Sequence, residues 1–123
     1  MKKYLLAAMS ILFVSHSIFP AMFTIENYTG SDIAVTVKLD KSWGSPTIEA
    51  KIMNGGDHTF NTGIHVVPRG GISWELEGDN YSLSHVYIDK PLMIGGVIRL
   101  FKTGTYEFKF RDGRSGYGNI QRD

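Results

Sequence analysis

The feature that most constrains the fold is a period-two alternation of apolar and polar residues that recurs along the chain after residue 21. Successive side chains of a β-strand point to opposite faces, so such alternation is typical of strands with one buried and one exposed face. A helix would instead require apolar residues three and four positions apart. The sequence therefore predicts half-buried strands, most clearly over residues 33–39, where the apolar positions are Ile33, Val35, Val37 and Leu39.

Turn signals separate the predicted strands at intervals of about 8–12 residues, as in small all-β domains. The strongest signal is Asn54-Gly55-Gly56-Asp57, because tight hairpin turns need backbone angles that Asn and Gly tolerate. Residues 58–67 fit either two short strands or one irregular edge, and Gly95-Gly96 indicates a bulge or bend. We expect the other strands at 23–26, 33–39, 47–53, 72–77, 81–88, 92–101 and 105–111.

These patterns predict an all-β fold, an antiparallel β-sandwich of about 7–9 strands in an Ig-like or jelly-roll-like arrangement. We divide the chain into a signal peptide at 1–21, a single β-sandwich domain at 22–111 and a flexible tail at 112–123 that contains Gly and Arg. The tail is expected to fray because its apolar content is low.

The first residues have the layout of a secretory signal peptide. A positive start, Met1-Lys2-Lys3, precedes an apolar stretch at 4–14 and the polar run Ser15-His16-Ser17. A membrane-spanning helix is the alternative, but polar residues interrupt the stretch before the ~20 apolar residues that a span requires. Cleavage is expected after Ser17, which leaves small side chains at both recognition positions, or after Ala21.

The chain contains no cysteine, so its stability must come from packing and strand pairing rather than disulfides. With the Met-Lys-Lys start, this favours a bacterial periplasmic or secreted protein without a transmembrane anchor in its mature form. Asn-x-Ser/Thr triplets at Asn27 and Asn80 resemble glycosylation acceptors, but we interpret them as polar residues of turns and strand ends. Without Lys2 and Lys3, the 13 basic residues fall to 11 against 12 acidic ones, so no nucleic-acid partner is expected.

The motifs of common enzyme classes are absent from the sequence, which has no cysteine nucleophile, no Gly-x-Ser-x-Gly elbow and no His-Glu-x-x-His zinc site. Glu75 and Glu77 stand two apart on an expected strand, about 7 Å between Cα atoms, which is a carboxylate spacing that glycosidases use. Any outward strand face produces this spacing. We therefore expect no catalytic residue, no cofactor and no enzymatic activity.

The histidines His58, His65 and His85 are the candidate metal ligands, because imidazoles on adjacent strands can bind copper or zinc. Their spacing contains no i, i+2 pair. Surface histidines are therefore the preferred interpretation, and a metal-binding periplasmic protein or a small hydrolase is the less favoured function.

The candidate ligand-binding residues are aromatic and basic. Trp43 lies in the polar loop 41–46, where it could anchor a ligand or cover one end of the sandwich. The last quarter of the chain is basic. Tyrosines could extend an aromatic platform for carbohydrate, namely Tyr28, Tyr81, Tyr87, Tyr106 and Tyr117. Trp74, in contrast, is expected in the core. The full candidate set is Trp43, Tyr28, Tyr81, Lys109 and Arg111.

The start of the predicted domain, Phe23-Thr24-Ile25-Glu26-Asn27 followed by the alternation from Ile33 to Val37, is similar to the start of thaumatin-like and aegerolysin-like proteins. Both are families of exported β-sandwiches. Thaumatin-like domains rely on many disulfides, which this chain cannot form. The similarity is confined to strand pattern and transfers no site residue.

Two functions follow as hypotheses. The first is an exported, non-enzymatic binding or interaction module that presents loops or a sheet edge to a protein or envelope partner. An uncovered sheet edge would also allow dimerisation or the addition of a peptide strand. The alternative is a protein that binds carbohydrate or lipid head groups through Trp43, the tyrosines and the basic C-terminal region.

Overall fold

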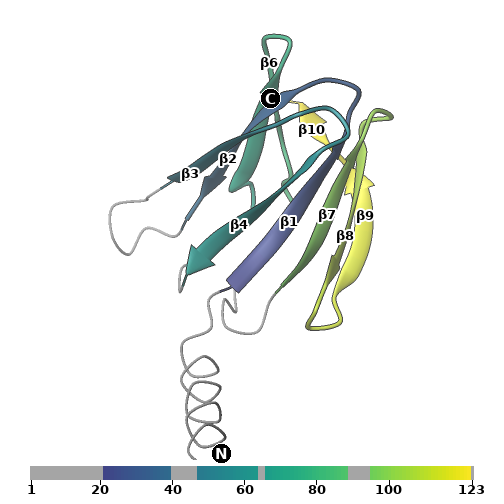
Figure 1. The fold of residues 1–123 in the computed structure, drawn as a ribbon. Helices are drawn as coiled ribbons and strands as arrows, with labels where there is room; N and C mark the ends of the chain where they lie inside the picture. Colours follow the sequence, from purple (N-terminus) through teal and green to yellow (C-terminus); the bar gives the residue numbers. More distant parts are fainter. Residues whose placement is uncertain (1–20, 40–46, 64–65, 89–94, 123) are drawn as a thin grey trace, which may run out of the picture.

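The computed structural model describes residues 21–39, 47–63, 66–88 and 95–122, which fold as two five-stranded sheets stacked face to face (Figure 1). Within these ranges the chain forms strands and turns and no helix, which confirms the predicted β-sandwich. Sheet A has the order β4 (Asp57–Gly63), β1 (Ala21–Tyr28), β7 (Gly95–Phe101), β8 (Thr105–Phe110) and β9 (Ser115–Asn119). Sheet B has the order β10 (Gln121–Arg122), β6 (Asp79–Ser82), β5 (Ile72–Leu76), β2 (Ile33–Lys38) and β3 (Thr47–Ile52).

The ladders between these strands are antiparallel, with one exception. β1 runs parallel to β7, and their residues pair one to one from Met22↔Gly95 to Tyr28↔Phe101. Parallel neighbours need a long crossover, and here the chain passes through sheet B between β1 and β7. The predicted antiparallel sandwich is thus confirmed in its sheets, and the parallel pair is an addition that alternation could not predict, because alternation shows which face of a strand is buried but not which strand lies beside it.

Among the described strands the chain changes sheet five times, between β1 and β2, β3 and β4, β4 and β5, β6 and β7, and β9 and β10. Two of these connections join edge strands at opposite sides of the sandwich. On one side, β3 of sheet B leads into β4 of sheet A through the predicted turn, where the N–H of Gly55 donates to the carbonyl of Asn27 at 2.8 Å. On the other side, β9 leads into β10 through Ile120. Both β3 and β4 are consequently edge strands, and they lie on the side of the molecule away from β9 (Figure 1).

The core lies between the sheets and follows the predicted alternation. Trp74 is only 3% exposed, which confirms its predicted place in the core. Burying apolar surface at about 25 cal/mol per Å² is the main stabilising term for such a chain without disulfides. The largest fully buried side chains are Phe23, Phe60, Ile25, Ile33, Ile52, Ile72, Leu83, Ile88, Ile98, Leu100, Val35 and Val37.

The segment predicted as a flexible tail forms two strands instead. β9 pairs with β8 in sheet A, and β10 pairs with β6 in sheet B. A Cβ atom at Gly116 would lie 3.0 Å from the ring of Phe108, and one at Gly118 would lie 3.0 Å from the Tyr106 hydroxyl. The rings of β8 thus cover the backbone of β9, so the neighbouring strand supplies the apolar contact that the segment itself lacks.

Several predicted boundaries differ from the structure. β4 runs unbroken from Asp57 to Gly63, whereas the single strand expected at 81–88 ends at Ser82 and Ile88 forms only an isolated bridge with Val67. The expected bulge at Gly95-Gly96 is also wrong, because Gly96 pairs in register with both neighbours. Of the predicted signal peptide at 1–21, residues 1–20 lie outside the described residues, as does the start of the strand expected at 92–101.

Candidate functional site

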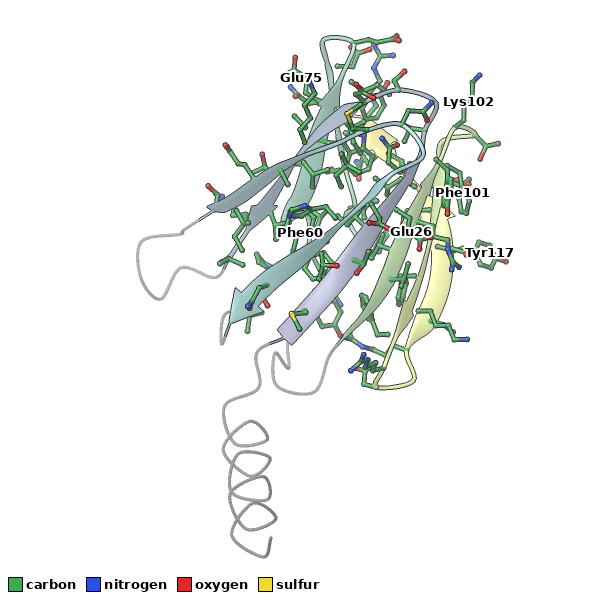
Figure 2. All side chains as sticks on the ribbon, in the orientation of Figure 1. Glu26, Phe60, Glu75, Phe101, Lys102 and Tyr117 are labelled. Carbon is green, nitrogen blue, oxygen red and sulfur yellow. The ribbon has the colours of Figure 1, made fainter. Side chains whose placement is uncertain are left out.

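A hollow of about 640 Å³ lies on the outer face of sheet B. Glu75 projects from this sheet on the side away from sheet A, whereas Phe60 of sheet A lies between the sheets (Figure 2). The side chains that point into the hollow are those at the outward positions of four neighbouring strands. They are Glu49 and Lys51 of β3, Ala34 and Thr36 of β2, Ser73 and Glu75 of β5, and Asn80 of β6.

The strand register explains why the sheet is hollowed here. Ala34 of β2 stands between Lys51 of β3 and Glu75 of β5, and Thr36 stands between Glu49 and Ser73 in the next row. Small side chains therefore form the floor, and longer charged side chains rise on either side of it. Because the pairing places hydroxyl, carboxylate and ammonium groups around one depression, the hollow offers both hydrogen-bond donors and acceptors.

The carboxylate pair considered for glycosidase chemistry is not on one strand. β5 ends at Leu76, and Glu77 adopts a positive φ of 53° in the turn that follows. The interpretation of Glu75 and Glu77 as two residues of one strand face is therefore wrong, because the chain reverses direction between β5 and β6. Glu75 faces the hollow without Glu77.

A second surface, the outer face of sheet A, carries a ladder of charges. Nε of Arg99 lies 2.7 Å from Oε1 of Glu26, and Nη1 of the same guanidinium lies 2.8 Å from Oε1 of Glu107. The hydrogen bonds to Glu107 and Glu26 raise the pKa of Arg99 above its ordinary value. Arg99 thus links β1, β7 and β8 on this face.

Aromatic side chains flank this ladder. The rings of Tyr28 and Phe101 stack with centroids 6.0 Å apart, and Tyr117 of β9 is 88% exposed. Tyr117 pairs across strands with Glu107, so it stands at the end of the ladder. This face therefore carries exposed aromatic rings as well as charges, which gives it an amphipathic character.

The Tyr28 hydroxyl donates a hydrogen bond to Oε1 of Glu26 at 3.2 Å, which raises the pKa of Tyr28 above its ordinary value of about 10. Ionisation would lose this bond and place a second negative charge beside the carboxylate. We expect Glu26→Gln to lower the Tyr28 pKa, measured by NMR titration of the ring carbon that bears the hydroxyl. Glu107→Gln is the control and should leave it unchanged; an unchanged Tyr28 pKa in Glu26→Gln would contradict the assignment.

The structure places three of the five predicted ligand-binding residues on the outer face of sheet A, with Tyr28 at one end of the β1–β7 pair and Lys109 and Arg111 toward the other. Tyr28 and Lys109 occupy outward positions of sheet A, and the Arg111 side chain lies beside Gly95 on the same face, 3.1 Å from where a Cβ would stand. Tyr81 is not on this face, because its ring stacks on Trp74 of sheet B with centroids 6.1 Å apart. Trp43 lies outside the described residues.

Sequence reasoning did not single out Arg99 or Phe101 of sheet A, and of the outward side chains that line the hollow it considered only Glu75 as a candidate site residue. Of the tyrosines considered for an aromatic platform, Tyr117 is exposed on sheet A, whereas Tyr106 is buried. The alternation of side chains along each strand could have indicated which of these side chains face outward. It could not have shown that β7 lies between β1 and β8, or that β2 lies between β3 and β5, and both surfaces depend on that adjacency.

The candidate metal ligands occupy different parts of the fold. His58 is on β4, where its ring meets the edge of Phe60 at a centroid distance of 4.7 Å, and His85 is in the turn that follows β6. His65 lies outside the described residues. Within those residues, no group of three His, Cys, Asp or Glu side chains is placed to hold a metal ion.

Comparison with known proteins gives no family assignment. No protein-family model matches the sequence, and no curated protein matches it significantly. Across the residues that the structure covers, no helix has the length and hydrophobicity needed to cross a membrane.

Proposed function

We propose that this protein is an exported, non-enzymatic binding module that holds a polar, hydroxyl-rich ligand, such as a segment of an oligosaccharide, in the hollow of sheet B. The observation that carries the proposal is the hollow itself, a depression of about 640 Å³ with a small-residue floor and polar walls. This volume lies within the ~300–1,000 Å³ typical of ligand sites.

The chemistry of the walls favours hydroxyl groups over a purely apolar ligand. The carboxylates of Glu49 and Glu75 accept hydrogen bonds, and the ammonium of Lys51 and the amide of Asn80 donate them. Charges of both signs face each other across the floor at Lys51 and Glu75, so a neutral ligand fits better than a strongly charged one.

The scaffold also supports a binding role. The hollow rests on four paired strands whose inner faces include Val35 and Trp74, both at most 3% exposed. A site on paired strands keeps its geometry without rearrangement, which reduces the entropy cost of binding.

Export to the periplasm or beyond is part of the proposal and is supported by the signal-like pattern at 1–17.

A second candidate, binding of an anionic lipid head group or glycan, is favoured by the outer face of sheet A. There the stacked pair Tyr28–Phe101 and the exposed Tyr117 lie on the same face as Lys109 and Arg111. A face that carries both aromatic rings and cations suits ligands that have an apolar and a charged part.

Two matched tryptophan substitutions distinguish the faces. Ala34→Trp fills the floor of the hollow, and Thr24→Trp is the equivalent change on the outer face of sheet A. On a panel of neutral oligosaccharides, we expect Ala34→Trp to weaken binding roughly tenfold or more, and Thr24→Trp to leave it unchanged.

The converse result identifies the second candidate. If Thr24→Trp rather than Ala34→Trp weakens binding to anionic glycans or to phosphatidylglycerol liposomes, the ligand face is sheet A and the proposal for the hollow is wrong. Circular dichroism of both variants establishes that each has kept its fold.

A further inference from the structure

Strand β3 is an edge strand of sheet B. Within the described residues β3 pairs with β2 alone, and the pairing is one to one from Lys38↔Thr47 to Ile33↔Ile52. Natural proteins commonly protect such an edge with proline, a bulge or charges that repel a partner. The strand Thr47-Ile48-Glu49-Ala50-Lys51-Ile52 has no proline, and its two charges have opposite sign.

The hydrogen bonds of β2 show which backbone groups of β3 face away from β2. The N–H of Lys38 donates to the carbonyl of Gly71 at 2.7 Å, so Lys38 faces β5. Successive residues of a strand direct their backbone groups to opposite edges, so Val37 and Val35 face β3. Their partners Ile48 and Ala50 therefore bond to β2. It follows that Glu49 and Lys51 present their N–H and C=O groups on the side of β3 away from β2.

We propose that two copies of this chain pair through β3, antiparallel, about a two-fold axis at Ala50. In this register Glu49 stands opposite Lys51 of the partner subunit, and Lys51 stands opposite Glu49 of the partner subunit. These are the residues whose backbone groups face outward, so each pair exchanges two backbone hydrogen bonds. The side chains of each pair also carry opposite charges on the same face, which stabilises the pairing.

The charges select this register among the alternatives. A shift of two residues places Glu49 opposite Glu49 of the partner subunit or Lys51 opposite Lys51 of the partner subunit, and like charges directly opposite are destabilising. A shift of one residue places outward-facing backbone groups opposite inward-facing ones and turns the apolar side chains to the wrong face.

The inner face of β3 gains cover from the same arrangement. Ile48 and Ala50 are half-buried and pack at the margin of the core, whereas Ile52 is 1% exposed. Pairing sets Ile48 opposite Ile52 of the partner subunit, so the apolar layer continues from one subunit into the other. Sheet B and its partner would form one sheet of ten strands across the axis.

The first test reverses the charges. Analytical ultracentrifugation across micromolar to near-millimolar concentrations should show a dimer for the wild-type protein. Lys51→Glu and Glu49→Lys should each weaken dimerisation about tenfold or more, because each makes both cross-strand pairs repulsive. A mixture of the two variants should associate as a heterodimer. Glu75→Lys, on the same face but away from the edge, is the control and should remain dimeric.

The second test uses the absence of cysteine from the chain. The axis places Ala50 opposite its own copy at the short ~4.5 Å Cα spacing, so Ala50→Cys should form an intersubunit disulfide under mild oxidation. Ala34→Cys, one strand further into the sheet, should not. A wild-type protein that stays monomeric throughout the concentration range, or an Ala50→Cys variant that does not cross-link, would overturn the proposal. Neither result depends on ligand binding in the hollow.

Discussion

Asn27→Ala is expected to lower the free energy of unfolding by about 3 kcal/mol, because it removes a buried hydrogen-bonding centre and leaves several polar partners unsatisfied. The Asn27 side chain is fully buried. Its Nδ2 donates to the carbonyls of Ser31 at 2.8 Å, Ile52 at 3.0 Å and Met53 at 3.2 Å. Its Oδ1 accepts from the backbone N–H of Thr29 at 3.0 Å and from the Thr29 hydroxyl at 2.6 Å.

These bonds join three separate parts of the chain: the end of β1, the turn before β2 and the end of β3. Asn27 therefore ties the two sheets together at the point where the chain crosses from β3 to β4. Urea denaturation at equilibrium measures the loss. Asn27→Asp keeps the volume but removes the donors, so it should also destabilise the protein.

Asn80 provides the matched control, because it begins the other Asn-Tyr-Ser/Thr triplet but is exposed. We expect Asn80→Ala to change stability by less than about 0.5 kcal/mol. Equal effects of the two alanine variants would show that the network at Asn27 does not stabilise the fold.

The contrast between these asparagines shows what local pattern can and cannot predict. Both triplets were interpreted as polar residues of turns and strand ends, and that interpretation holds for their place in the chain: Asn27 precedes the last residue of β1, and Asn80 lies in the hairpin β5–β6. The two asparagines differ in burial, since Asn27 is buried and Asn80 is exposed. The carbonyl oxygens of Ile52 and Met53 lie 3.0 and 3.2 Å from Nδ2 of Asn27 but belong to residues 25 and 26 positions away in the sequence.

In the fold, too, the features set by local spacing could be predicted, and those set by contacts between distant segments could not. The buried alternation of β2 and the core position of Trp74 follow from period-two spacing and were predicted. The parallel pair β1–β7 and the strand β9 were not, because they depend on contacts between distant segments. In the case of β9, the apolar cover comes from Phe108 and Tyr106 of the neighbouring strand, and a stretch that is poor in apolar residues gives no sign of it.

The two candidate surfaces also differ in how much of each could be predicted from the sequence. The chemistry of Tyr28, Lys109 and Arg111 makes them candidates from sequence alone, and they share one face because each occupies an outward position in the alternation of sheet A. The hollow of sheet B was not predicted, since its floor consists of Ala34, Thr36 and Ser73, which are unremarkable until β2 and β5 lie side by side.

Gly96→Ala is expected to destabilise the protein by about 4 kcal/mol or more, a large part of the stability of a small domain. Gly96 has a φ of 149°, and a Cβ atom there would lie 2.2 Å from the carbonyl oxygen of Lys109 and 2.7 Å from Cα of Phe110. Both neighbours are backbone atoms of β8, the strand paired with β7. Relief would require β7 and β8 to separate in the middle of sheet A. The measurement is again urea denaturation, with expression yield as a second readout.

Gly113→Ala separates the two causes of the stability loss at Gly96, which are the positive φ and the close contact with β8. Gly113 also has a positive φ, 96°, but a Cβ atom there would meet nothing within 4 Å. Its substitution should cost only the backbone strain, about 1–2 kcal/mol. The excess at Gly96 then measures the close approach of β8, which is why glycine is needed inside a regular strand where the sequence suggested a bulge. If the two variants lose the same stability, backbone conformation alone explains Gly96 and the close contact with β8 is not the constraint.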